Sequence, residues 1–131
     1  MSEKILIIDD DIDTLRLVGL VLQKEGYQII TANNGKQGLL KMSEETPDLI
    51  LLDIMMPEMD GYEVARRLRK NPKTAEIPIL MFTAKSQIED KVTGFESGAD
   101  DYLTKPTRPI DLQAHIRALL SRSQKTETEQ T

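Results

Sequence analysis

Short apolar runs recur along the chain, and each one precedes a longer segment with a helical period. Four of these runs are almost wholly apolar, and several of their residues are β-branched: Ile5–Ile8, Gln28–Thr31, Leu49–Leu52 and Ile79–Phe82. A fifth, weaker run is Tyr102–Thr104. Continuous apolar strands, as opposed to alternating ones, are typical of parallel sheets covered on both faces. The pattern therefore predicts five strands in a parallel sheet.

Apolar residues three or four positions apart indicate a helix after every run. The first helix is marked by Leu15, Val18 and Leu22. It should end at Gly26, where a residue of positive φ fits. The other four helices are marked, in chain order, by Leu39 and Met42, by Tyr62, Ala65 and Leu68, by Ile88, Val92 and Phe95, and by Ile110, Ile116 and Leu119–Leu120. Strand then helix, five times over, predicts the α/β class and a doubly wound parallel sheet.

The length of 131 residues suits one compact domain. Residues 123–131 contain no apolar side chain, and we expect them to form a flexible polar tail or the start of a linker. The chain has no cysteine, which excludes a disulfide scaffold, a thiol nucleophile and a thiolate metal site.

The composition of the chain argues against nucleic acid and membranes as partners. The 22 acidic and 17 basic residues give a net charge of −5, and only 4% of residues are aromatic, with no Trp. We therefore expect no direct nucleic-acid binding. No stretch approaches the roughly 20 apolar residues that span a bilayer. The first apolar run is short and stops at three aspartates, unlike a signal peptide. The expected location is the cytoplasm, without membrane contact.

Polar side chains gather where the predicted strands end. Asp9–Asp11 follow the first strand and Asp53 follows the third, while Thr83 closes the fourth and Lys105 follows the fifth. In an open α/β sheet the ligand crevice lies outside the carboxyl ends of the strands. We therefore expect these residues, from four different strands, to meet at one place.

Those residue types suit phosphoryl chemistry. Asp9, Asp10 and Asp53 would repel one another, which should raise the pKa of at least one carboxyl group. A hard divalent cation such as Mg²⁺ would relieve the repulsion, because it prefers oxygen ligands. Lys105 and Thr83 add a cation and a hydroxyl that can stabilise a transferring phosphoryl group. One of the carboxylates could itself be the nucleophile.

Each residue also has a purely structural interpretation. An Asp after a strand is often a helix N-cap or a turn residue, and Asp13 suits the first turn of a helix. Taken alone, Lys105 suits a solvated lysine, Tyr102 a half-buried packing residue and His115 a surface or packing histidine. The joint placement of three acids, a hydroxyl and a lysine favours a functional site.

Four linked motifs carry a family resemblance. They are Ile5–Asp11, Asp53–Gly61, Ile77–Ala84 and Gly98–Pro106. In this order and at this spacing, the chain resembles the receiver domain of two-component response regulators and is similar to the single-domain chemotaxis members of that family. The resemblance covers residues 4–122. It implies a flavodoxin-like (βα)5 fold, with a five-stranded parallel sheet in the order 2-1-3-4-5.

The resemblance also implies a metal site and a phosphorylation site. Asp53 matches the residue that accepts a phosphoryl group from a histidine kinase or a histidine phosphotransfer protein. Asp10 and Asp53 match direct ligands of Mg²⁺, with Mn²⁺ as a substitute. Asp9 matches an acid that holds the metal through water, and the backbone carbonyl of Met55 matches a further ligand.

The remaining roles that the resemblance implies concern switching. Lys105 matches the lysine that binds a phosphoryl oxygen, Thr83 the hydroxyl that moves toward the phosphate, and Tyr102 the aromatic switch. A downstream effector would bind the face formed by the fourth helix, fifth strand and fifth helix, and a phosphorylation-dependent dimer is a further expectation. The implied function is a signalling switch that catalyses only its own phosphorylation and dephosphorylation.

The chain departs from the family pattern after the lysine. Thr107 stands where the family commonly has an apolar residue, and Arg108–Pro109 follow it. The packing of this loop and of the last helix is therefore left open. The Lys105–Pro106 bond lies beside the predicted site, and we expect it to be cis.

Other functions fit the residues less well. Haloacid dehalogenase-like phosphatases need Asp-x-Asp with Thr two residues later. If Asp9 and Asp11 form the pair, Asp13 stands at the Thr position, and if Asp11 and Asp13 form it, Leu15 stands there. A non-phosphorylated pseudo-receiver, acting only by binding partners, would lack the acceptor, the lysine or the acidic pair, and all of these are present.

A calcium loop that begins at Asp9 also fails. It needs Gly at its sixth position and Glu at its twelfth, where the chain has Thr14 and Leu20. Glycine-rich dinucleotide and P-loop motifs do not occur.

Overall fold

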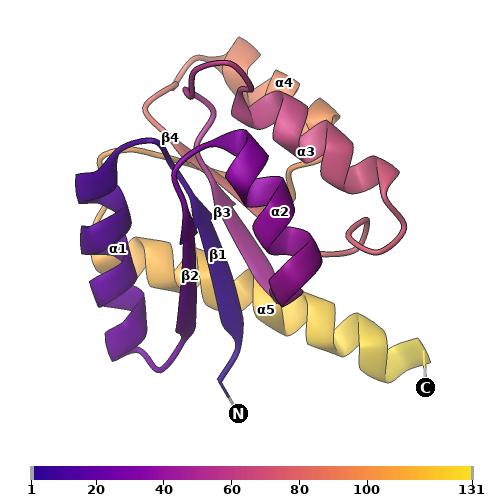
Figure 1. The fold of residues 1–131 in the computed structure, drawn as a ribbon. Helices are drawn as coiled ribbons and strands as arrows, with labels where there is room; N and C mark the ends of the chain where they lie inside the picture. The colour runs from indigo at the N-terminus through magenta and orange to yellow at the C-terminus, as the bar shows by residue number, and fades with distance from the viewer. Residues whose placement is uncertain (1, 131) are drawn as a thin grey trace.

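Strands and helices alternate five times in the computed structural model, which describes residues 2–130, with side chains described up to residue 123. The strands are β1 (Lys4–Ile8), β2 (Gln28–Ala32), β3 (Leu49–Leu52), β4 (Ile79–Thr83) and β5 (Asp101–Thr104). The helices are α1 (Ile12–Lys24), α2 (Gly35–Glu45), α3 (Gly61–Lys70), α4 (Ile88–Ser97) and α5 (Pro109–Gln130). The predicted element order is confirmed (Figure 1).

All five strands pair in parallel, in the order β2-β1-β3-β4-β5. This confirms the flavodoxin-like order that the resemblance implies. β3 and β4 are buried at every position, whereas Gln28 and Thr31 of the edge strand β2 are exposed. The two polar residues of the predicted second strand therefore lie where the sheet meets water.

Two apolar layers pack on opposite faces of the sheet. Ile5 and Ile7 of β1 face the layer that includes residues of α1 and α5, and Leu6 and Ile8 face the layer that includes residues of α2 and α3. Figure 1 shows α1 and α5 on one side of the sheet and α2 and α3 on the other. The central strands have unbroken apolar runs in the sequence because both of their faces are covered by helices.

Capping side chains fix where the first three helices begin. Asp11, Asn34 and Asp60 are the N-caps of α1, α2 and α3, and each accepts a backbone N–H from two or three residues later at 2.8–3.0 Å. α1 ends at Lys24, and Gly26 has a φ of 98°, which confirms the expected stop.

The last helix is longer than the sequence indicates. α5 runs over Pro109–Gln130, so its backbone is helical well past residue 122 (Figure 1). Thr131 lies outside the described residues, and the character of residues 123–131 as a tail or linker stays a prediction. Among the helices that the structure describes, none combines the length and apolar character needed to cross a membrane.

Arg69, near the end of α3, ties two loops together, the one between α3 and β4 and the one between α4 and β5. Its guanidinium donates to the carbonyl oxygens of Ile77 (2.7 Å), Ala75 (3.0 Å) and Gly98 (3.0 Å), and it pairs with Asp100 at 2.7 Å. These groups lie before β4 and before β5. A buried carbonyl without a donor is costly. By supplying these donors, the Arg69 side chain fixes the loops that lead into β4 and β5.

We expect Arg69→Met to lower the free energy of unfolding by about 2 kcal/mol, because it leaves several loop carbonyls without a donor. Arg66→Met in the same helix is the matched control. The Arg66 side chain is exposed and hydrogen-bonds to Ser97 and Glu63, so its loss should cost about 0.5 kcal/mol or less. Urea unfolding followed by circular dichroism measures both. Equal losses in the two variants would contradict this role of Arg69.

Candidate functional site

The polar residues predicted at the strand ends lie at one edge of the sheet. Asp9 directly follows β1, Asp53 directly follows β3, Thr83 is the last residue of β4 and Lys105 directly follows β5. One carboxylate oxygen from each of Asp9, Asp10 and Asp53 lies within 4.8 Å of the others. We call these three residues the acidic trio. Their convergence from separate strands is as the sequence predicts.

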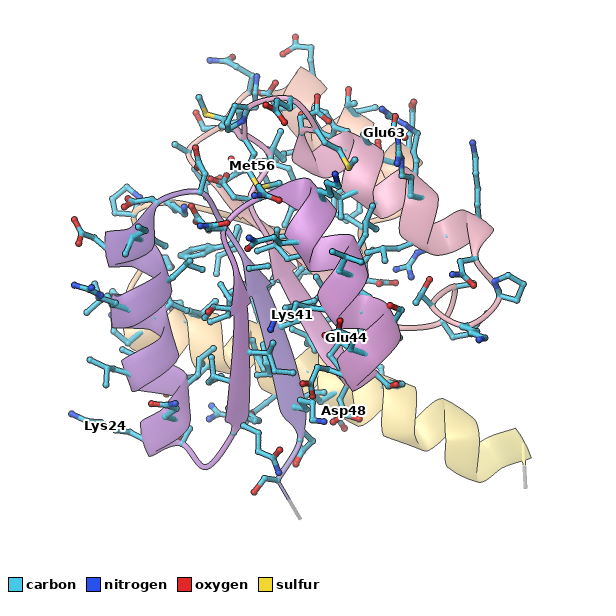
Figure 2. All side chains as sticks on the ribbon, viewed as in Figure 1. Lys24, Lys41, Glu44, Asp48, Met56 and Glu63 are labelled. Carbon is cyan, nitrogen blue, oxygen red and sulfur yellow. The ribbon has the colours of Figure 1, made fainter. Side chains whose placement is uncertain are left out.

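Figure 2 helps to locate this edge. Its labels place Asp48, just before β3, at one end of the molecule and Met56, in the loop after β3, at the other. The acidic trio belongs to the end marked by Met56, since Asp53 lies in the same loop.

The strands themselves bury two of the three acids. Asp9 continues the pairing of β1, donating its N–H to the Ala32 carbonyl at 3.1 Å, and Asp53 donates its N–H to the Ile8 carbonyl at 2.9 Å. Consequently Asp9 is 2% exposed and Asp53 is 7% exposed. Asp10 is exposed. The trio therefore has a buried base and an open, solvent-facing side.

Lys105 is the cation that compensates the buried acids. Its Nζ lies 2.6 Å from Asp9 Oδ2 and 3.6 Å from Asp53 Oδ2. The same ammonium lies 5.2 Å from the centre of the Phe82 ring, which is a cation–π distance. The sequence pattern places Phe82 only in a strand. The sequence signal for a place of Phe82 near the site is its position one residue before Thr83.

Burial raises the pKa of Asp9 above its usual range, while the hydrogen bond from Lys105 opposes the rise. The nearby charge of Asp53 adds a smaller upward contribution. The sequence predicts a raised pKa from repulsion among the acids. The structure has the raised pKa, but its larger cause is the removal of the carboxylate from water.

The acidic trio fits a hard divalent cation. Three carboxylates face one ammonium, so the cluster carries excess negative charge when its carboxyl groups are ionised, and its oxygens are near enough to share one ion. Met55 lies in the same loop, and its N–H is 3.4 Å from Asp53 Oδ1. Its side chain is exposed. A role for its carbonyl oxygen stays a prediction.

The loop after β3 is held tightly against Asp53. The Gly61 N–H donates to the Ile54 carbonyl at 2.9 Å. A Cβ on Gly61 would overlap the Asp53 carbonyl oxygen and lie 2.7 Å from the Ile54 Cα. Gly61 starts α3 without a positive φ, and close backbone approach is the reason for glycine. Positive φ occurs instead at Glu58, with φ of 69°, which the sequence did not indicate.

The backbone of Lys85 contacts both residues that were predicted to switch, through its N–H and its carbonyl. Thr83 is fully buried, and its Oγ1 accepts the Lys85 N–H at 3.4 Å. The Tyr102 hydroxyl donates to the Lys85 carbonyl at 2.7 Å. Tyr102 is 8% exposed, and burial raises its pKa to about 12. Its ring therefore points inward, packed at a centroid distance of 6.5 Å from Phe95.

Other singled-out residues lie away from the acidic trio. His115 Nδ1 is 2.6 Å from Asp101 Oδ2, so it joins α5 to the start of β5. Thr107 is partly buried in the loop before α5. The Lys105–Pro106 bond is cis, as expected.

Comparisons with known proteins agree with this geometry. The family model of the response regulator receiver domain matches residues 5–117. The chain is 46% identical over 124 residues to the alkaline phosphatase synthesis transcriptional regulatory protein PhoP of Bacillus subtilis, covering 95% of this chain and 51% of that protein. It is 49% identical over 120 residues to the DNA-binding dual master transcriptional regulator RpaA of Synechocystis, covering 92% of this chain and 50% of that protein. The chain thus spans about half the length of these relatives.

Solved structures of similar size share the fold. A putative response regulator from Chloroflexus aurantiacus superposes with a TM-score of 0.89 at 37% identity, covering 92% of this chain and 99% of that one. Chemotaxis protein CheY4 of Vibrio cholerae superposes with a TM-score of 0.87 at 33% identity, covering 91% and 99%. With the family model matching most of its length, the chain belongs to the response regulator receiver domains of two-component systems.

Proposed function

We propose that this domain accepts a phosphoryl group on Asp53, in a Mg²⁺-dependent reaction, from a histidine kinase or a histidine phosphotransfer protein. Phosphorylation and Mg²⁺ dependence are general for receiver domains. The observation that carries the proposal for this chain is the acidic trio with Lys105, at the ends of β1, β3 and β5.

Hydrogen bonding favours Asp53 over Asp9 as the nucleophile. Both oxygens of Asp9 are engaged: Oδ2 with Lys105 at 2.6 Å, and Oδ1 with the Asp11 N–H at 2.9 Å. The contacts of Asp53 are longer, at 3.4 Å to the Met55 N–H and 3.6 Å to Lys105. An oxygen of Asp53 is therefore freer to attack phosphorus. The P–O bond forms as the P–N bond of phosphohistidine breaks, and its electron pair stays on the histidine nitrogen.

The metal would be held by Asp10 and Asp53 directly, by Asp9 through water and by the Met55 carbonyl. When bound, Mg²⁺ or Mn²⁺ neutralises charge on the carboxylate and phosphoryl oxygens. Lys105 already lies beside the two buried acids, so its ammonium can bind a phosphoryl oxygen with little movement. The bond that Thr83 Oγ1 accepts from the Lys85 N–H is long, at 3.4 Å, and the hydroxyl can donate to the phosphate.

The binding surface that responds is proposed to be the face of α4, β5 and α5. Ile88, Val92 and Phe95 of α4 are 76%, 49% and 48% exposed, and they lie on one side of the helix because of their spacing. Phe95 also packs against Tyr102. An effector, or a second phosphorylated copy, that covers this stripe would therefore sense the position of the Tyr102 ring.

The proposed domain is a signalling switch in the cytoplasm that catalyses only its own phosphorylation and dephosphorylation. A phosphatase would instead release phosphate repeatedly without storing it. A pseudo-receiver is disfavoured because the acceptor, the lysine and the acidic pair lie together. We propose no direct nucleic-acid or membrane contact for this domain.

Intact-mass measurement after incubation with acetyl phosphate and Mg²⁺ tests the acceptor. The wild type should gain one phosphoryl group that survives acid and is lost in base, because it is an acyl phosphate. Asp53→Asn should gain none, since the amide is not a nucleophile. Asp13→Asn, which replaces an exposed acid of α1 outside the trio, should label normally. Labelling of Asp53→Asn at the wild-type level would refute the assignment.

Thermal unfolding in increasing MgCl₂ tests the metal site. A ligand that binds only the folded state raises stability by about 2.7 kcal/mol at one hundred times its Kd. The wild type and Asp13→Asn should both show a rise in Tm with Mg²⁺. Asp10→Asn should lose most of that rise. Asp10 is exposed, so its replacement disturbs no buried contact. A full Mg²⁺ response in Asp10→Asn would remove this residue from the ligand set.

Light scattering tests the apolar stripe of α4 as a dimer surface. The molar mass of the wild type should rise toward that of a dimer when it is phosphorylated. Val92→Glu should remain monomeric, because it places a charge in the stripe. Leu17→Glu is the matched control, as Leu17 is an exposed apolar residue of α1, and it should dimerise. If the fully labelled wild type remains monomeric, or if Val92→Glu dimerises equally, the dimer proposal is wrong.

A further inference from the structure

A glycine interrupts the middle of α4, where alanine would favour the helix. This residue, Gly94, is buried and has an ordinary place in the helix Ile88–Ser97. Its φ is not positive, so backbone conformation does not require glycine here. The reason must therefore be sought in what a side chain at this position would contact.

A Cβ on Gly94 would press on the ring of Tyr102. It would lie 3.1 Å from both Cδ2 and Cε2 of that ring, and 3.8 Å from Cγ of Met81. Carbon atoms in favourable contact are about 3.5–4.0 Å apart. The contact with Met81 would be ordinary, but the contact with Tyr102 would be too close along one whole edge of the ring.

The ring has little freedom to move away while it stays inside. Its hydroxyl is held by the Lys85 carbonyl at 2.7 Å, and Phe95 packs beside it. Moving the ring by a few tenths of an ångström would strain the hydroxyl bond. If the ring turned outward, to the surface, its contacts with Lys85 and Phe95 would be replaced by contacts with water, and a side chain at position 94 would no longer press on it.

Helix α4 is also restrained from retreating. The Tyr62 hydroxyl donates to the Asp90 carbonyl at 3.1 Å, which ties the first turn of α4 to α3. The Asp90 carboxylate accepts the Gln87 N–H at 3.2 Å and lies 3.7 Å from the Lys85 ammonium. The start of the helix is thus fixed to the same loop whose carbonyl holds Tyr102.

We propose that Gly94 is the positioning residue that admits Tyr102 to its inward place, and that a side chain at position 94 shifts the ring outward. Gly94 lies in α4 and is no part of the acidic trio. The consequence for signalling rests on the proposed function, because it assumes that partners respond to Tyr102. The steric relation between Gly94 and Tyr102 does not depend on that assumption.

Gly94→Ala is the variant to measure, with Gly19→Ala as its matched control. Gly19 is also a buried glycine inside a helix, α1, and a Cβ there would lie 3.7 Å from the Ile29 Cγ2, an ordinary contact. Both substitutions favour the helix to the same extent. A difference between them therefore reports the Tyr102 ring rather than helix propensity.

Two measurements on the unphosphorylated protein report the ring directly. Nuclear Overhauser contacts between the Tyr102 ring and residue 94 should be strong in the wild type and in Gly19→Ala, and should weaken at least twofold in Gly94→Ala. The second is Tyr102 ionisation, resolved from the other tyrosines by ring-labelled NMR assigned with Tyr102→Phe. With a pKa of about 12, about one Tyr102 in ten is ionised at pH 11. If exposure returns the pKa to about 10, about nine in ten are ionised. Circular dichroism at pH 11 verifies that each variant is folded.

A double-mutant comparison keeps the proposal testable if Gly94→Ala folds poorly. In a Tyr102→Ala background the ring is absent, so Gly94→Ala should increase the folded fraction in urea. With Tyr102 present, Gly94→Ala should give a smaller increase in the folded fraction, or a decrease. The same increase in both backgrounds would overturn the proposal. So would wild-type ring contacts and wild-type ionisation in Gly94→Ala, because α4 would then have yielded in place of the ring.

Phosphorylation separates this inference from the proposed function. Gly94→Ala should label with acetyl phosphate like the wild type, and its phosphorylation-dependent dimer should be weaker. If the wild type fails to label at Asp53, the proposed function is wrong, and the ring measurements still decide whether Gly94 positions Tyr102. If labelling is normal but the ring is unmoved, the inference about Gly94 alone is wrong.

Discussion

Two buried carboxylates at the end of an apolar sheet are the constraint on which this edge of the domain depends. Asp9 and Asp53 are buried because β1 and β3 continue their pairing by one more residue. Uncompensated charges in such a place cost several kcal/mol each. Lys105, which follows the last strand, supplies the compensation. The first, third and fifth strands must all be in place before these charges are balanced, so the chemistry of the site depends on the completed sheet.

Much of this architecture could be predicted from the sequence, since its signals are strong and local. Runs such as Leu49–Leu52 are apolar throughout because both faces of the strand are covered. Parallel strands bring their carboxyl ends to one edge, so the gathering of the trio followed from element order. Strand order came from the family resemblance, because local patterns do not specify which strands pair. The close approach of Gly61 to Asp53, and the Phe82 ring beside Lys105, depend on tertiary distances that no local pattern contains.

The site and the proposed binding surface are joined by a short route. Thr83 lies beneath the acidic edge, Tyr102 lies against α4, and both bind the backbone of Lys85. Tyr102 in turn packs against Phe95, whose other side is exposed. The Thr83 hydroxyl at one end and the apolar surface of α4 at the other are therefore separated by one residue, Lys85, and one aromatic ring. No movement of whole helices across the sheet is needed to connect them.

The bonding of two side chains to the backbone of Lys85 also bears on timescale. Lys85 donates its N–H to Thr83 and accepts the Tyr102 hydroxyl with its carbonyl. These two groups belong to the successive peptide units that meet at the Lys85 Cα, so movement of the backbone at this residue changes both bonds. Loop motions take place in nanoseconds to microseconds, whereas collective domain motions take microseconds to milliseconds. The relay within this domain is thus expected to be fast beside the chemistry that starts it. Under the proposed phosphorylation of Asp53, the duration of a signal would be set by the lifetime of the aspartyl phosphate and not by the return of the fold.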